Sequence, residues 1–238
     1  MKYLQLENEA VQGEAECSAD AIRPKQAEEA RLAQLEAELS ALPADAPLLQ
    51  LIGLRNDIGY ILHDLERRDE AWELGHNSFR QAMAAQLWEQ AVQGCDIIYQ
   101  AEKDDAIKAL AHGVWLAVTY PIDPELSVLV LKNLVEETPP KADAAAIPAA
   151  AAAYLVELRA DGKLREDLQF FTAGMLANVA KNHSEVVDNK EMFDFWVERL
   201  ELNDPAKFLP RLGKLLDVLV PDSWWYDRDL LRSQLPAE

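Results

Sequence analysis

Glycine, cysteine and long apolar runs are scarce in this sequence, and each scarcity excludes a class of protein. Only nine of the 238 residues are glycine, and the patterns Gly-x-x-x-x-Gly-Lys, Gly-x-Gly-x-x-Gly and Gly-x-Ser-x-Gly are absent. Phosphate-cradling loops and nucleophile elbows need such patterns. The two cysteines, Cys17 and Cys95, are too few for a disulfide framework or a four-thiolate metal site. We expect both to be free thiols in a reducing compartment.

Membrane-directing segments are also lacking. The longest run of low polarity, residues 147–156, is mostly alanine and has about half the length that a membrane-spanning helix requires. The first sixteen residues are acidic, whereas a signal peptide has a basic start and an apolar centre. The sequence therefore predicts a soluble protein of the cytoplasm with no membrane partner.

Basic residues are outnumbered, at 23 Lys and Arg against 42 Asp and Glu, which gives a formal net charge of −19. A surface with this charge repels phosphate backbones, so we predict no binding to nucleic acid. The same charge would attract a partner protein with a basic face. It can also serve only to keep the protein in solution.

The residues that are abundant favour helices. Half of the sequence is apolar, alanine, leucine and glutamate are common, and alternating strand patterns are nearly absent. We predict an all-α protein of about ten antiparallel helices joined by short turns, arranged as a helical-hairpin stack or as an irregular bundle. At most one short strand pair, near the N-terminus, is expected. The helices are expected at about 25–42, 47–65, 69–84, 87–101, 104–120, 124–138, 148–161, 164–181, 188–200, 204–220 and from 223 onward.

Local signals mark several helix ends. Asp123 followed by Pro124 predicts an N-cap, and Asp188 with Glu191 resembles a capping box. Gly162 suits the left-handed conformation after a helix. Gly53 and Gly59 indicate close approach of a neighbouring helix, because neither has a Cβ atom.

Composition also divides the chain. We expect a polar acidic leader over residues 1–24, an N-terminal helical part over 25–138, a linker over 139–148 and a C-terminal helical part over 149–238. The leader should be dispensable for folding, because its apolar content is low. The alternating residues 2–6 are the one part of it that could pair with another element.

No catalytic residue, cofactor site or metal site is predicted. Di-iron bundles need a Glu-x-x-His pattern on two helices, and Glu73-x-x-His76 has no second copy. The clearest candidates for partner binding are Trp224, Trp225 and Tyr226. Successive residues on a helix diverge by about 100°, so we expect at least one of these aromatic side chains at a seam or on the surface, where such residues form binding hot spots. The alternative is that they fix the last helix to its own domain.

Residues 54–99 resemble tetratricopeptide-type helical hairpins. The resemblance is carried by Asn56-Asp57-Ile58-Gly59, by Ala71 twelve residues after the glycine, and by Leu87-Trp88-Glu89-Gln90-Ala91. It implies stacked helical hairpins, although Ala71 and Ala91 are only twenty residues apart, where such an array repeats about every thirty-four.

A second resemblance concerns the later half of the chain. A small, acidic and helical protein that carries Ala-Ala-Ala-Tyr154-Leu-Val-Glu-Leu in its second half is similar to the accessory proteins of metalloenzymes such as nitrogenase. It implies a metalloenzyme complex as partner. Three functions follow from the sequence: a non-catalytic accessory or assembly factor that docks on another protein, a helical-bundle enzyme or cofactor carrier, and a self-assembling structural protein.

Overall fold

The computed structural model describes residues 3–4, 18–139, 142–183, 189–221 and 223–235. Over these residues the protein consists of α-helices, one short 3-10 helix and irregular connections, without a strand, which confirms the all-α prediction. The helices are α1 (Ser18–Ser40), α2 (Leu48–Asp64), α3 (Arg68–Ala84), α4 (Trp88–Gln100), α5 (Ala106–Thr119), α6 (Pro124–Glu136), η1 (Asp143–Ala145), α7 (Ala146–Arg159), α8 (Gly162–His183), α9 (Lys190–Arg199), α10 (Pro205–Leu219) and α11 (Arg228–Ser233).

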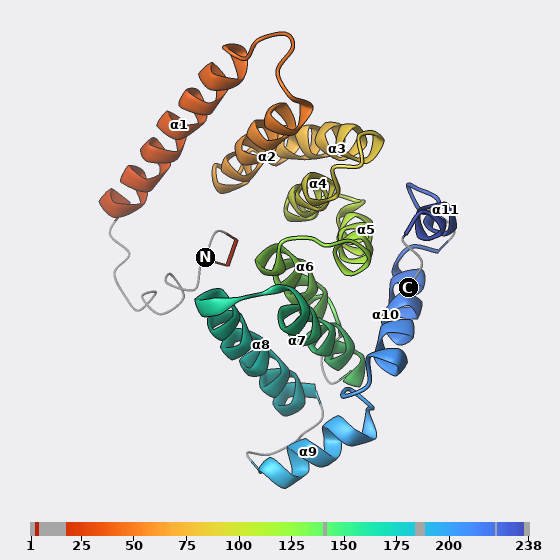
Figure 1. Cartoon of the computed structure of the whole chain (residues 1–238). Coiled ribbons are helices and arrows are strands. Elements are labelled where there is room, and N and C mark those ends of the chain that lie inside the picture. The colour runs from red at the N-terminus through yellow and green to blue at the C-terminus, as the bar shows by residue number, and fades with distance from the viewer. Residues whose placement is uncertain (1–2, 5–17, 140–141, 184–188, 222, 236–238) are drawn as a thin grey trace.

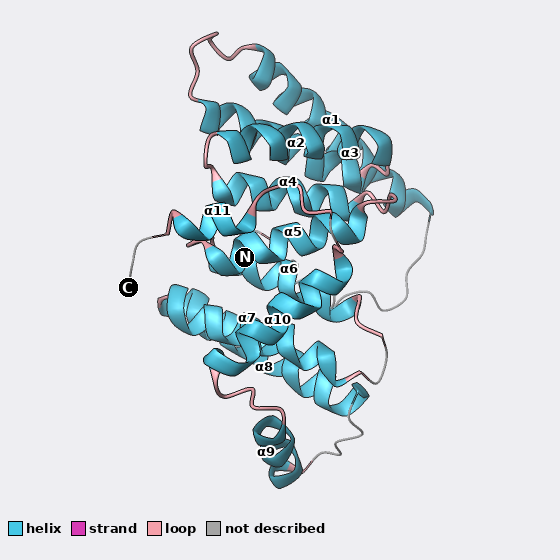
Figure 2. Cartoon of the chain, turned by 90° about the vertical axis from the view of Figure 1, so that its right-hand side faces the viewer, coloured by secondary structure: helices cyan, strands magenta, loops and turns pink. Residues whose placement is uncertain are grey.

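Helices α2 to α8 form a stack in which each helix packs on the next along the chain (Figures 1 and 2). In addition, α2 packs on α4, α4 on α6 and α6 on α8. We call the side formed by α2, α4 and α6 the inner face, and the side formed by α3, α5 and α7 the outer face. Helix α10 lies on the outer face against α5 and α7, and α1 packs on α2. Figure 1 shows the short red segment beside the N label, residues 3–4, and α10 on opposite sides of the stack.

The turns that follow α2, α3 and α4 are tight although they contain no glycine. Glu66, Gln86 and Glu102, which follow α2, α3 and α4, have φ angles of 59°, 56° and 54°. This left-handed conformation costs a residue with a Cβ atom about 1–2 kcal/mol. Main-chain hydrogen bonds offset the cost, such as the one that Arg67 N–H donates to the Leu62 carbonyl at 2.8 Å.

Glycines permit close contact between the backbones of α3 and α4. A Cβ atom on Gly94 would lie 3.0 Å from the Phe79 nitrogen and 3.1 Å from the Gly75 carbonyl oxygen. The close approach predicted from Gly53 and Gly59 holds for the second only. A Cβ atom on Gly59 would lie 2.8 Å from an isoleucine side chain of α4, whereas one on Gly53 would meet nothing within 4 Å.

The predicted helix signals have mixed outcomes. The Asp123 side chain accepts hydrogen bonds from two N–H groups of the first turn of α6, as predicted. Gly162 has the predicted left-handed conformation, with φ of 55°, but α7 already ends at Arg159. The cap predicted at Asp188 lies outside the described residues. Helix α9 is instead capped by the Asn189 side chain.

The structure differs from the predicted linker over residues 139–148. Residues 145–148 are buried, and Pro148 belongs to the first turn of α7. Proline is tolerated there because the first N–H groups of a helix have no partner within it. One large core, called here the main core, contains buried residues from both sides of the predicted linker. A smaller core lies between α1, α2, α3 and α4.

Candidate functional site

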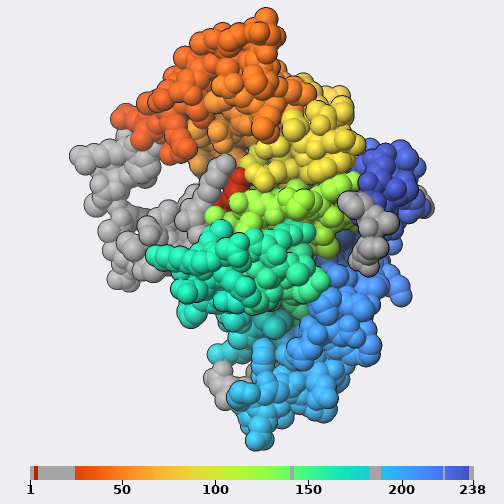
Figure 3. Space-filling model, in the orientation of Figure 1, coloured from red at the N-terminus to blue at the C-terminus, as the bar shows by residue number. Residues whose placement is uncertain are grey.

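The inner face holds two residues of the predicted leader, Tyr3 and Leu4. Leu4 is only 5% exposed and belongs to the main core, and Tyr3 packs against the same core. The space-filling view shows the pair, in red, set between the helices of the N-terminal half and those drawn in green (Figure 3). The structure thus differs from a leader over residues 1–24 at two places, because α1 also begins at Ser18 rather than at Lys25. The high average polarity of this segment does not reveal that one of its leucines lies in the core.

The side chain of Glu125 binds the main chain of this pair. Its Oε1 atom accepts hydrogen bonds from the N–H groups of both Tyr3 and Leu4, each at 2.7 Å. Two successive N–H groups that point at one anion form the kind of concave donor site called a nest. Glu125 is placed by the local sequence, because Asp123 and Pro124 fix the first turn of α6. Glu125 is only 5% exposed, so these hydrogen bonds compensate for the hydration that its carboxylate has lost.

The Tyr3 side chain is recognised by a chain of amides. The Tyr3 hydroxyl accepts a hydrogen bond of 2.6 Å from Gln93 Nε2 in α4. Gln93 Oε1 accepts one of 2.9 Å from Asn56 Nδ2 in α2, and Asn56 also donates to the Gln90 carbonyl. Gln93 and Asn56 are both buried. Three helices of the stack therefore contribute one polar side chain each to the site, which we call the Tyr3–Leu4 site: Asn56, Gln93 and Glu125.

A cavity of about 230 Å³ adjoins Tyr3 on the inner face. Asp57, Tyr60 and Asp64 of α2 line it, and burial raises the pKa of Asp64. Asp96 lies behind this lining and is completely buried.

The Asp96 carboxyl joins α4 to α6. Its oxygens accept hydrogen bonds from Gln100 Nε2 at 2.6 Å and from Asn133 Nδ2 at 3.2 Å. Burial raises the pKa of Asp96 to about 7, although the neighbouring Tyr60 and Gln100 side chains stabilise the carboxylate. The same burial raises the pKa of Tyr60 well above its ordinary value. The inner face thus carries a carboxyl group that changes charge near neutral pH.

The three aromatic residues predicted to bind a partner lie in one strip on the outer face. They were expected within the last helix, and this is wrong, because α11 begins only at Arg228. Trp224, Trp225 and Tyr226 form a non-helical segment, so the divergence of side chains on a helix does not apply to them. All three contact His112 of α5, with ring centroids 4.3–5.2 Å apart. All three are half-buried, and whether one also meets a partner stays a prediction.

We call residues 223–235 the C-terminal strap. His112 anchors it, because its Nε2 atom accepts the Trp225 N–H at 2.8 Å and its carbonyl accepts the Tyr226 hydroxyl at 3.0 Å. The Nδ1 atom lies 2.5 Å from the Lys108 carbonyl, so these partners require the neutral imidazole with the proton on Nδ1. Burial lowers the pKa of His112 to about 4.

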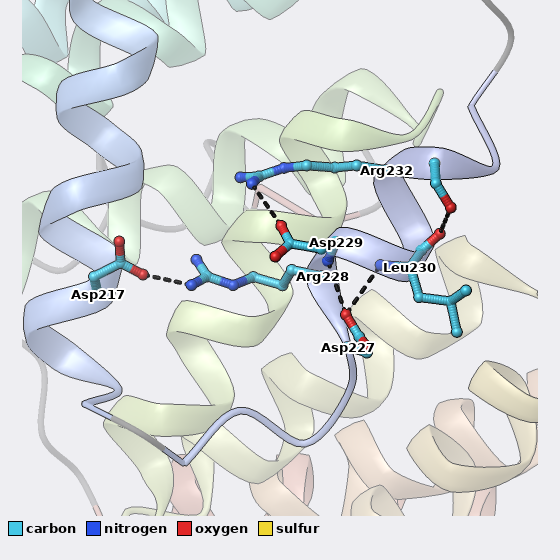
Figure 4. A network of polar contacts seen from close by, with 7 residues as sticks. Asp217, Asp227, Arg228, Asp229, Leu230 and Arg232 are labelled. Carbon is cyan, nitrogen blue, oxygen red and sulfur yellow. Dashed lines mark hydrogen bonds and ion pairs between the residues drawn. The ribbon is translucent and has the colours of Figure 1, made fainter.

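An ion pair joins the strap to α10, and a side chain of the strap caps the strap's own helix, α11. Arg228 forms an ion pair with Asp217 at 2.7 Å, and its guanidinium lies 3.8 Å from the centre of the Trp224 ring. The Asp227 side chain accepts the N–H groups of Asp229 and Leu230 and so caps α11 (Figure 4). These contacts give the strap a fixed path over the outer face.

The other residues considered from sequence take part in packing. His76 Nε2 lies 2.7 Å from Asp105 Oδ2, and the Trp72 indole donates to the same carboxylate at 2.7 Å. Within the described ranges, no group of three or more His, Cys, Asp and Glu side chains is placed to hold a metal ion. Cys95 is a buried free thiol whose pKa is raised by burial. Cys17 lies outside the described residues.

A second cavity, of about 700 Å³, lies between α7, α8, α9 and α10. Its lining is mainly apolar, so it suits an apolar group; the lining includes Tyr154, Leu176, Phe193 and Phe208.

In the part of the chain that the structure describes, no helix has the length and apolar character to cross a membrane. No protein-family model, curated protein or solved structure matches this chain.

Sequence reasoning missed the residues of the Tyr3–Leu4 site. Glu125 was assigned only to the helix dipole of α6, Asn56 was considered only as part of the pattern that resembles a helical hairpin, and Gln93 was assigned no role. The one usable signal was the alternation of residues 2–6, which is unusual in a helix-forming sequence. That signal indicates a segment able to pair, but it does not indicate where.

Proposed function

We propose that this protein is a non-catalytic binding protein, which holds a short non-helical segment of another protein on its inner face. One observation carries the proposal: the inner face already binds such a segment, Tyr3–Leu4, by main-chain N–H groups, a hydroxyl and an apolar side chain. Main-chain capture combined with a place for a side chain is how proteins recognise non-helical peptides.

The geometry favours binding over catalysis. Glu125 is engaged with main-chain N–H groups, and Asp96 is held by two amide side chains behind the cavity lining. These contacts position carboxyl groups as acceptors, which is the chemistry of recognition.

Charge adds a preference for the partner. The chain has a net charge of −19, and the cavity next to the site is lined by two acidic residues, Asp57 and Asp64, and one basic residue, Arg31. A basic partner segment would be drawn to this face over distances of about 10 Å at 0.1 M salt. Association should therefore weaken as salt rises, mainly through a slower on-rate.

Two matched substitutions on α6 test the proposal. Glu125→Ala removes the acceptor of the site, whereas Glu136→Ala removes an exposed carboxylate that only pairs with Lys132 one turn away. Proteins captured from the native cell by the wild-type chain should be retained by Glu136→Ala and lost by Glu125→Ala. Thermal unfolding of both variants controls for folding. Capture that is the same for both folded variants would refute a role for the inner face.

A further inference from the structure

The Tyr3–Leu4 site is occupied by the chain itself, and this has a consequence for any partner. Building on the function proposed above, we infer that Tyr3–Leu4 is a built-in competitor for the partner site. The partner segment that it excludes has the same chemistry, a tyrosine followed by a branched aliphatic residue in a non-helical conformation.

Each contact of the site selects for one feature of the segment that is bound there. Glu125 requires two successive N–H groups, which excludes proline at either position. Gln93 donates to the Tyr3 hydroxyl, so phenylalanine at that position leaves a buried donor without its acceptor. The place of Leu4 in the main core, where it is 5% exposed, requires an aliphatic side chain rather than a polar one.

The occupant can leave without unfolding a helix. Tyr3 and Leu4 belong to no helix or strand, and the side chains of Glu125 and Gln93 hold them by hydrogen bonds. The stack around them is held by its own contacts between α2, α4 and α6. Release of the pair therefore exposes a site that is already formed.

Tethering sets the strength of the competition. Because the pair and α1 belong to one chain, rebinding of the pair is an intramolecular event, which favours it over a free segment with the same contacts. A free segment must therefore displace a competitor that belongs to the same chain, and a partner captured by wild type binds more weakly than it would to the vacated site. Substitutions that release the pair should strengthen binding of such a segment by at least about ten-fold.

A peptide with the sequence of residues 1–8, Met-Lys-Tyr-Leu-Gln-Leu-Glu-Asn, tests this inference. Labelled at its C-terminal end, it is titrated with the full wild-type chain and with the full chain carrying Tyr3→Ser and Leu4→Ser, and binding is followed by fluorescence anisotropy. The double variant should bind the peptide at least about ten-fold more tightly than wild type. Adding Glu125→Ala to the double variant should abolish binding, whereas adding Glu136→Ala should not.

Peptide variants and unfolding measurements complete the test. A peptide with phenylalanine in place of tyrosine, or alanine in place of the first leucine, should bind the double variant more weakly. Equal binding of the original peptide by wild type and double variant would overturn the competitor while the proposed function stood. Absence of binding to the folded double variant would overturn both. A double variant that no longer folds would show that the pair is part of the core, which also overturns the inference.

Discussion

Asp96 and His112 are both buried, and they should change the stability of the protein with pH in opposite directions. Burial raises the pKa of Asp96 from an ordinary 3.8 to about 7 and lowers that of His112 from 6.5 to about 4. In the folded protein Asp96 therefore keeps its proton, and His112 stays neutral, over a range where the unfolded chain has the opposite protonation state.

The sign follows from the protons exchanged on unfolding. Between pH 3.8 and pH 7, unfolding releases the Asp96 proton, so the free energy of unfolding falls as pH rises. Between pH 4 and pH 6.5, unfolding lets His112 take up a proton, so the free energy rises with pH. Each contribution is about 1.4 kcal/mol per pH unit. In the shared window from pH 4 to pH 6.5 the two nearly cancel in the wild-type protein.

Single substitutions should reveal each contribution. Urea unfolding of Asp96→Asn and His112→Gln is measured beside wild type at about pH 4.5 and about pH 6.5. From about pH 4.5 to about pH 6.5, the free energy of unfolding of Asp96→Asn should rise by about 2 kcal/mol relative to that of wild type. That of His112→Gln should fall by about as much relative to wild type. The Gln100 and Asn133 amides can rotate to suit the new asparagine. Differences from wild type that do not change with pH, or that change with the same sign, would refute the reasoning.

Two further predictions concern packing. Gly94→Ala should destabilise the protein by about 1–3 kcal/mol, because the added Cβ atom would collide with the backbone of α3. Gly53→Ala should instead stabilise the protein by about 0.5–1 kcal/mol, because the space around Gly53 is open. Urea unfolding of the two variants compares them directly. Alanine at Trp224, Trp225 or Tyr226 should lower stability by about 2 kcal/mol or more, because all three pack on His112; a variant that keeps its melting temperature and loses affinity for a captured partner would instead assign that residue to a binding surface.

Local chemistry explains which parts of the fold could be predicted from the sequence. Asp123 with Pro124, and Asp204 with Pro205, mark helix starts that the structure confirms, because an N-cap and the residue after it act within one turn. The start of the last helix was placed too early. Asp227 is an equally good N-cap residue. The aromatic residues before it are compatible with a helix in sequence, but they lie in a non-helical segment that packs on α3 and α5.

The Tyr3–Leu4 site could not be predicted because its parts are distant in sequence. Leu4 and Glu125 are 121 residues apart, and no periodicity links a two-residue segment to the first turn of a remote helix. Glu125 also has a sufficient local reason to be acidic, at the positive end of the α6 dipole. A residue that satisfies one local rule gives no sign of a second role.

The C-terminal strap has a consequence for the order in which the protein can be made. Trp225 and Tyr226 contact His112 across 113 and 114 residues of sequence. In an open array of repeats each unit contacts only its neighbours, so units can form and open separately. Here the aromatic surface around Phe79 and His112 stays uncovered during synthesis until the ribosome has added the strap. In the finished protein, early hairpins and late helices are therefore coupled, and opening either one weakens the other.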